Sequence, residues 1–185
     1  MVKAVIEAPY NHHVYHAATQ PSLRSAKEAF DSSNAQKVIN TLIRDCFLKH
    51  NIEKMFSVTV LHRHFDLQPD ERNVEEGGQA IASKDLDNIN PCSWLFYDGK
   101  LFPYEFRRAS PGQSIPPLPT EFVTDLWSIL QAHGLCDILG FQTYTDGLIG
   151  SESTDKTARV STTVDYAEEE FQNMRGVRAS FAFFQ

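Results

Sequence analysis

Two histidines and an aspartate follow a strand-like stretch at alternating positions. The segment from Met55 to Leu67 reads MFSVTVLHRHFDL, in which His62, His64 and Asp66 are spaced two residues apart. Side chains two residues apart on a β-strand point to the same face, with Cα atoms about 6.6 Å apart. The pattern therefore predicts a strand whose apolar face ends in two imidazoles and a carboxylate.

The same alternation divides this segment into two faces. The first face holds Phe56, Val58, Val60, His62, His64 and Asp66, and the second holds Ser57, Thr59, Leu61, Arg63, Phe65 and Leu67. If the first face packs on the core, a polar pocket forms where the core ends. If Leu61, Arg63 and Phe65 face inward instead, the site hypothesis fails.

A divalent metal site is one interpretation of the His62 and His64 pair, because two such imidazoles can converge on one ion. Zinc and non-haem iron commonly add a carboxylate or a third histidine to two histidines. The side chains that we considered for this addition are Asp66, Glu105, His16 and His133. The metal ligands predicted from spacing are His62 and His64.

Proton transfer is a second interpretation, since a neutral imidazole with a pKa near 6.5 is the usual proton carrier in enzymes. The catalytic residues would then be His62, His64 and Asp66, with the aspartate orienting a ring. In a third interpretation the two histidines end a strand and have a structural role. The sequence leaves these three alternatives open.

A β-hairpin rich in aromatic residues is predicted over residues 93–106, which read SWLFYDGKLFPYEF. Asp98-Gly99 suits a type I′ turn, and this register pairs Phe96 with Leu101 and Leu95 with Phe102. An aromatic wall with a few polar groups is typical of small-molecule sites. The candidate ligand-binding residues are Trp94, Phe96, Tyr104 and Glu105. The alternative is that this face belongs to the core.

The order of predicted elements indicates an α+β fold. Helices are expected over residues 23–30, 35–47, 120–133 and 165–174, and further strands over 79–83, 135–144, 159–164 and 177–184. Grouped strands joined by hairpins favour an antiparallel, strongly curved or barrel-like sheet with helices on one face. Residues 68–78 and 150–156 are expected to be polar connections.

The length of 185 residues suits one domain, here predicted as an irregular N-terminal arm over 1–20 and a single domain over 21–185. The arm contains His12, His13 and His16, which lack the glutamate of a zinc-protease motif and are expected to be structural or surface residues.

Composition excludes several classes of function. A net charge of −7 without a basic run argues against nucleic acid as a partner. No apolar stretch is long enough to predict a membrane span. Three scattered cysteines without metal-type spacing favour a reduced, cytoplasmic protein. The sequence is compatible with a homo-oligomer and does not predict one.

The segments LHRHFDL and SWLFYDGKLFPYEF resemble those of a family of small α+β proteins from filamentous fungi that has no assigned activity. The resemblance spans most of residues 56–106. It implies a cytosolic protein in a lineage rich in specialised metabolism.

The function predicted from these observations is an enzyme that binds a small apolar organic molecule. Its chemistry would be proton transfer of the lyase, isomerase or cyclase type, with or without a divalent metal. One alternative is a non-catalytic module that binds protein or carries a ligand. Another is a metal-dependent hydrolase.

Overall fold

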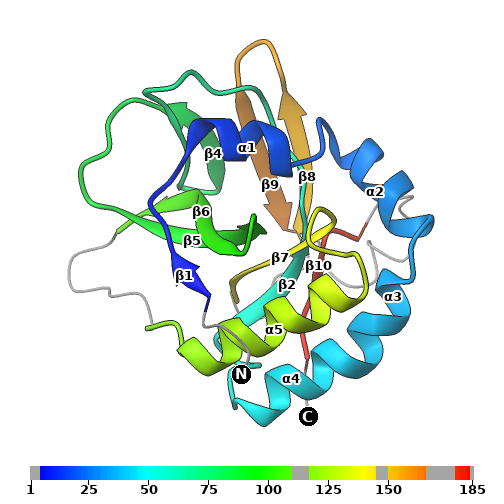
Figure 1. Cartoon of the computed structure of the whole chain (residues 1–185). Helices are drawn as coiled ribbons and strands as arrows, with labels where there is room; N and C mark the ends of the chain where they lie inside the picture. The colour runs from blue at the N-terminus through cyan, green and yellow to red at the C-terminus, as the bar shows by residue number, and fades with distance from the viewer. Residues whose placement is uncertain (1–4, 110–116, 145–149, 166–177, 184–185) are drawn as a thin grey trace.

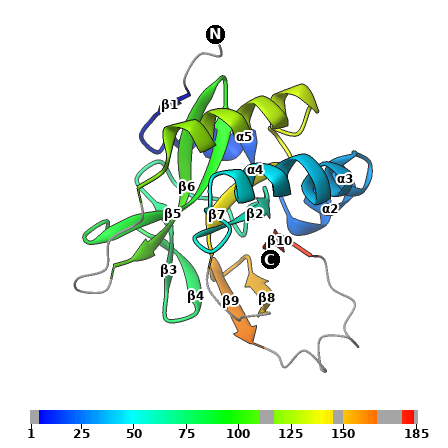
Figure 2. The ribbon, with the colours of Figure 1, turned by 90° about the horizontal axis from the view of Figure 1, so that it is seen from below.

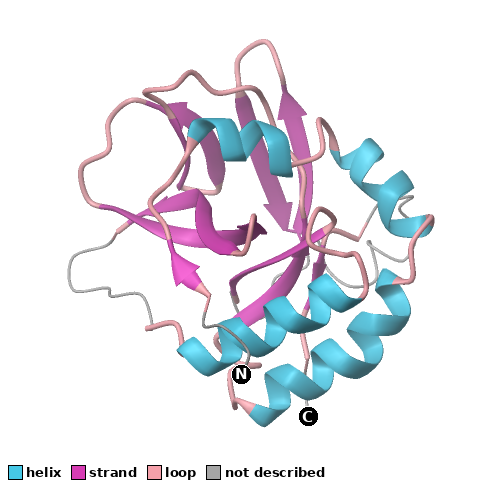
Figure 3. Cartoon of the chain, viewed as in Figure 1, coloured by secondary structure: helices cyan, strands magenta, loops and turns pink. Residues whose placement is uncertain are grey.

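The computed structural model of this chain describes residues 5–109, 117–144, 150–165 and 178–183 (Figure 1). The helix predicted over 165–174 lies outside the described residues, apart from its first position. The described part contains four helical segments, with α3, η1 and α4 forming one continuous helix, and ten strands (Figure 3).

The helical elements are α1 (His12–Ala18), α2 (Leu23–Asp31), α3 (Ala35–Val38), the π-helical turn η1 (Ile39–Ile43), α4 (Arg44–Lys49) and α5 (Thr120–Ala132). The strands are β1 (Ile6–Glu7), β2 (Phe56–Val60), β3 (Arg72–Glu76), β4 (Gln79–Ser83), β5 (Ile89–Tyr97), β6 (Lys100–Arg108), β7 (Leu139–Thr143), β8 (Gly150–Asp155), β9 (Val160–Asp165) and β10 (Ser180–Phe181). Within the described ranges, no helix is long and apolar enough to cross a lipid bilayer.

The strands form one strongly curled sheet, in the order β10-β2-β7-β5-β6-β3-β4-β9-β8, with β1 beside β6. Most neighbours are antiparallel, but β3 and β1 each pair with β6 in parallel. The α+β class and the curvature are confirmed, and the sheet is mixed rather than wholly antiparallel. The curl brings the two ends of this order, β10 and β8, near each other in both views (Figures 1 and 2).

The larger hydrophobic core lies between the sheet and helices α2 to α5. It includes Phe47 of α4, Phe56 of β2 and Phe122 of α5, all fully buried. A second core lies on the other side of the sheet, where Tyr15 of α1 packs with Leu61 and other apolar side chains. Helices therefore cover both faces, because α1 contributes apolar residues at 14, 15 and 18 to the second core.

The predicted hairpin register is confirmed. Phe96 pairs with Leu101 and Leu95 with Phe102 between β5 and β6. Asp98 and Gly99 have φ values of 48° and 68°, as a type I′ turn requires.

Three polar segments have more regular structure than their composition predicts. Residues 12–18 of the expected irregular arm form α1, whose N-terminus is capped by Asn11. Strand β3 lies in the expected connection 68–78, and β8 lies in the expected connection 150–156. Each of these strands is fixed by pairing with a distant or neighbouring strand, which a local hydrophobic pattern does not record.

Candidate metal centre

The histidine segment continues β2 in an extended conformation. Arg63 N donates to Gln20 O at 2.8 Å, and Gln20 N donates to Leu61 O at 3.4 Å. These bonds form a short parallel bridge that fixes His62 between them. As a result His62 and His64 are held in the interior, with exposed fractions of 7% and 8%.

His62 has one ring nitrogen bonded to the backbone and one that lacks a partner. Nδ1 lies 2.9 Å from Val60 O, and since a carbonyl oxygen only accepts, Nδ1 carries the proton. The other nitrogen, Nε2, is buried without a hydrogen-bond partner. It lies 4.0 Å from Glu152 Oε1. His62 therefore presents a free lone pair toward Glu152.

His64 is held between two carboxylates. Its Nε2 lies 3.1 Å from Glu105 Oε1 and donates to it. Its Nδ1 forms an ion pair with Glu152 Oε1 at 2.5 Å. The His62 and His64 rings are 4.9 Å apart at 75°. Both rings thus direct one nitrogen to the same oxygen of Glu152.

Glu105 is fixed by a row of polar side chains across three strands. Its register partners are Asn73 on β3 and Ser93 on β5. Asn73 Nδ2 donates to Glu105 Oε1 at 3.2 Å, and Ser93 Oγ donates to Oε2 at 2.7 Å. With the bond from His64, this carboxylate accepts three hydrogen bonds. Its role is to orient the His64 ring.

Glu152 comes from β8, at the opposite end of the sheet from β2. Thr154 Oγ1 donates to Glu152 Oε1 at 3.3 Å. The Glu152 side chain is 29% exposed, so the cluster opens to solvent on this side. The three side chains of the cluster therefore join the two ends of the curled sheet.

The pKa values follow from burial and mutual contact. Burial opposes charge on His64, but its hydrogen bond with Glu105 and its ion pair with Glu152 outweigh this effect and raise its pKa to about 10. Burial likewise opposes charge on Glu152, and contact with His64 outweighs it and lowers the pKa to about 2. The pKa of Glu105 is lowered, since His64 outweighs burial there too.

The donor set fits a divalent transition metal. Nε2 of His62, Nδ1 of His64 and Oε1 of Glu152 all lie within 4.8 Å of one another. A tetrahedral zinc with bonds of about 2.0–2.1 Å separates its ligand atoms by roughly 3.3 Å, so small side-chain movements suffice. A carboxylate or carbonyl bonded to the second nitrogen of a metal-binding histidine is the common supporting arrangement, and Glu105 and Val60 provide it here.

The charges of the cluster also favour a bound divalent ion. Glu105 and Glu152 bring two negative charges together, and one proton on His64 offsets half of them. A divalent ion that replaces this proton neutralises both carboxylates. The arrangement also leaves a position for water or a substrate, as in catalytic zinc sites with three protein ligands.

Asp66 does not join the two histidines, contrary to the alternation argument. Its side chain is 79% exposed and lies 3.6 Å from Arg63 Nη1 and 3.8 Å from His16 Nδ1. Regular alternation ends because the backbone bends at residues 64–65. The alternation also predicts that only one face of this segment is buried. In the structure both faces are buried, since Leu61 and Phe65 pack in the second core.

The four candidate ligand-binding residues separate into two groups. Trp94 and Phe96 are buried in the larger core, and Tyr104 is buried in the second core. These three side chains do not reach the cluster. Glu105 does, because the bulge between Ser93 and Trp94 and the parallel pairing with β3 align it with its polar neighbours.

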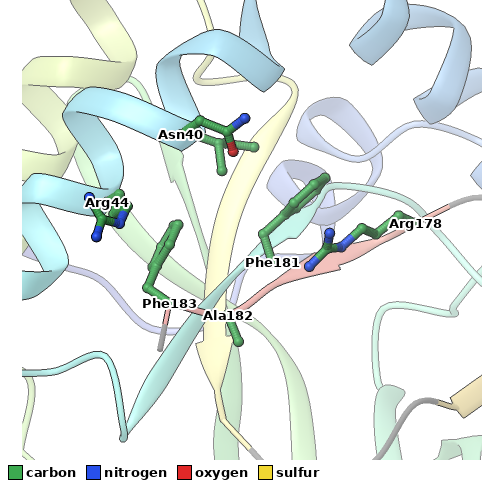
Figure 4. Close-up of a pocket in the computed structure, with 7 residues that line it drawn as sticks. Asn40, Arg44, Arg178, Phe181, Ala182 and Phe183 are labelled. Carbon is green, nitrogen blue, oxygen red and sulfur yellow. The ribbon is translucent and has the colours of Figure 1, made fainter. Parts of the chain in front are cut away.

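The other histidines considered as ligands lie elsewhere. His16 lies 3.3 Å from Leu67 O through Nε2, and His133 lies 3.5 Å from the Asn34 amide. A surface pocket of about 490 Å³ is also separate from the cluster (Figure 4). It is lined by Ile39, Asn40, Arg44, Arg178, Phe181, Ala182 and Phe183.

Glu152 was not among the residues predicted from sequence. The segment GSESTD has no apolar face, so its pattern predicts a polar connection rather than a strand. One signal was available: the strand predicted at 159–164 follows a short polar turn, and a hairpin needs a strand before its turn. Glu152 lies opposite Thr163 in that hairpin.

Comparison with known proteins found no matching family model, no matching curated protein and no matching solved structure.

Proposed function

We propose that this protein is a divalent-metal-dependent enzyme that hydrolyses a small organic molecule. The metal ligands are His62, His64 and Glu152. The observation that carries the proposal is the convergence of two buried ring nitrogens on one carboxylate oxygen of Glu152. One of them, His62 Nε2, has no hydrogen-bond partner, and the other, His64 Nδ1, is held there by an ion pair. A buried acceptor such as His62 Nε2 is costly to leave unpaired, and a bound cation would satisfy it.

The choice of zinc or ferrous iron rests on the two nitrogens and one oxygen of the donor set. A bound ion of this kind lowers the pKa of a coordinated water toward 7 and polarises a carbonyl or phosphoryl oxygen. The chain contributes the rest: Val60 O and Glu105 fix the ring orientations, and Glu152 lies on the solvent side, where a substrate enters.

Hydrolysis is favoured over metal-free proton transfer by the state of the other groups in the cluster. Glu105 accepts three hydrogen bonds, and its pKa is lowered because contact with His64 outweighs burial, so it is a poor acceptor for a substrate proton. His64 without metal has a pKa of about 10, well above the neutral range that suits a general base. The expected apolar substrate is therefore narrowed to one that carries an ester, amide or phosphate oxygen.

We place this enzyme in the cytoplasm. The three cysteines, Cys46, Cys92 and Cys136, are free, as is usual in a reducing compartment.

The first test is elemental analysis of protein purified without added metal or chelator. We expect about one zinc or iron per chain, and Glu152→Gln should lower this content at least tenfold. Asp66→Asn is the matched control, because it removes an exposed carboxylate from the histidine segment itself. Fewer than about 0.1 metal ions per wild-type chain would contradict the metal site, since three good ligands normally retain their ion.

The second test separates binding from reaction. The metal-loaded protein is assayed with p-nitrophenyl esters of carboxylic and phosphoric acids, with Glu152→Gln and Asp66→Asn in parallel. Hydrolysis that Glu152→Gln abolishes supports the proposal. If the metal-loaded protein cleaves none of these esters, the result contradicts the proposed hydrolase activity but not the proposed metal site.

A further inference from the structure

The third metal ligand comes from a weakly attached part of the sheet. Strand β8 has β9 as its strand neighbour in the described chain, and β9 pairs with β4 at three positions. One further backbone bond, from Thr163 N to Gly78 O at 3.0 Å, joins this hairpin to the β3–β4 turn. The short pairing by itself gives β8–β9 limited support, since isolated two-stranded hairpins are marginally stable.

An ion pair between Arg159, whose side chain is 37% exposed, and the buried Glu71 holds the turn of this hairpin against the histidine side of the molecule. Arg159 donates through Nη1 and Nη2 to both oxygens of Glu71, at 2.5 Å and 2.9 Å. The Glu71 side chain is 4% exposed, and Gln68 N donates to its Oε2 at 2.8 Å. Bidentate pairs of this kind fix orientation as well as distance.

The loop that carries Glu71 belongs to the same chain segment as the metal-site histidines. It follows Leu67, whose carbonyl oxygen accepts from His12 at 2.8 Å. Lys156 Nζ, on the hairpin turn, also reaches Pro21 O at 3.4 Å, next to the Gln20 bridge. The hairpin turn is thus tied to the two segments that flank His62 and His64.

We propose that Arg159 and Glu71 are positioning residues for the metal centre: their ion pair holds hairpin β8–β9 so that Glu152 meets His62 and His64 across the open seam of the sheet. This inference rests on the proposed metal site. According to this inference, an ion pair outside the ligand set raises the affinity for the metal. Because the coupling is reciprocal, a bound metal must in turn stabilise the attachment of the hairpin.

The hairpin turn supports this role by its own geometry. Asp155 Oδ1 accepts from the backbone N–H groups of Thr157 and Ala158, both at 2.9 Å. This turn leads directly to Arg159, which has φ of 54°. The guanidinium is therefore presented by a fixed turn, and moving the turn moves Glu152, which lies on the same short ribbon.

The test measures zinc affinity, by competition with a chromogenic chelator, for the wild type, Arg159→Gln and Arg159→Lys. We expect Arg159→Gln to weaken zinc binding by about 10- to 100-fold, as supporting residues of metal sites do. Arg159→Lys keeps the charge but not the bidentate geometry, so it should lose less. Lys27→Gln is the control, since it breaks an ion pair with Asp31 within helix α2 and leaves the Arg159–Glu71 pair intact.

A positioning role is separated from general destabilisation by a double-variant cycle. In a Glu152→Gln background, Arg159→Gln should cause no further loss of zinc affinity, because the ligand that it positions is gone. Hydrogen exchange provides a second readout, with zinc present in both samples. The backbone amides of residues 150–165 should exchange faster in Arg159→Gln than in the wild type, while the exchange rates of β5 and β6 stay unchanged. If Arg159→Gln does not fold, Glu71→Gln and Arg159→Lys serve in its place.

Three results overturn the inference. Equal zinc affinity of wild type and Arg159→Gln contradicts it and leaves the metal site intact. An equal loss with and without Glu152 shows a structural effect only. A wild-type chain that binds no zinc, iron or cobalt refutes the metal site itself, and the inference with it.

Discussion

Two pairs of histidines in this molecule have similar geometry and different chemistry. The His12 and His16 rings lie 4.6 Å apart at 60°, and the His62 and His64 rings lie 4.9 Å apart at 75°. In the first pair, both Nε2 atoms lie close to one acceptor, Leu67 O, at 2.8 Å and 3.3 Å. In the second pair, each ring has one bonded nitrogen and one that lacks a hydrogen bond.

The difference lies in the partners rather than in the rings. A backbone carbonyl takes the protons of the first pair, so these rings fasten α1 to the segment after the histidine strand. Val60 O and Glu105 each accept a hydrogen bond from one ring of the second pair, and the other nitrogen of each ring is directed at Glu152. Spacing of histidines therefore indicates a site only when the partners of the second nitrogens are known.

The largest expected effect separates the two pairs directly. His62→Ala removes a lone pair from the proposed metal site and should weaken zinc binding by more than about 100-fold, as loss of one of three protein ligands does. His12→Ala should leave zinc affinity unchanged and lower the free energy of unfolding by roughly 0.5–1.5 kcal/mol for one lost hydrogen bond. Chelator competition and urea denaturation measure the two quantities. Equal losses of zinc affinity in both variants would contradict the claim that only the His62 and His64 pair binds the metal.

A smaller effect is expected at Glu105, the carboxylate that distinguishes His64 from the other histidines. Glu105→Gln keeps an acceptor for His64 Nε2 but removes the charge that supports the ring. Zinc affinity should fall about tenfold, at the lower end of the range for such supporting residues. The cobalt-substituted protein should show a shifted visible absorption band. A variant with wild-type affinity and an unchanged cobalt spectrum would mean that Glu105 has no influence on the centre.

The last prediction concerns the pH dependence of stability in metal-free protein, and its sign differs between the pairs. The folded pKa of His64, about 10, lies above its ordinary value of 6.5. Its contribution is fully present below pH 6.5 and is lost as pH rises through 10. Burial lowers the pKa of His16 below 6.5, so its contribution is present above pH 6.5 and is lost as pH falls.

Urea denaturation of the metal-free protein between pH 5 and pH 10, compared with His16→Ala and Glu152→Gln, measures these contributions. Glu152→Gln should flatten the alkaline loss, since it removes one of the carboxylates that raise the pKa of His64. His16→Ala should flatten the acid loss. An alkaline loss of the same size in Glu152→Gln and wild type would contradict the assigned cause.

Local patterns in the sequence predicted much of this fold. The apolar stripe of 35–47 and the Asp98-Gly99 turn act over a few residues, so the helix and the β5–β6 register were predictable. The same local logic placed His62 and His64 together on one side. Glu105 is one of the four side chains that the sequence offers as a third metal ligand, and in the structure it accepts a hydrogen bond from His64 outside the proposed ligand set.

The remainder of the site depends on contacts between distant segments. Asp66 was expected inside because alternation was extended past the bend at residues 64–65, where the strand has ended. Glu152 was missed because a strand without apolar residues is stabilised by its neighbour and not by its own pattern.

By itself, then, the sequence determined the class of fold, the aromatic hairpin and a pair of imidazoles with a common orientation. The tertiary structure decided which carboxylates they meet. The reason is that side-chain alternation is a property of a few neighbouring residues, whereas the meeting of β2 with β8 depends on the curl of the whole sheet. Because the sheet curls, Glu152 of β8 lies beside His62 and His64, and the three side chains form one cluster.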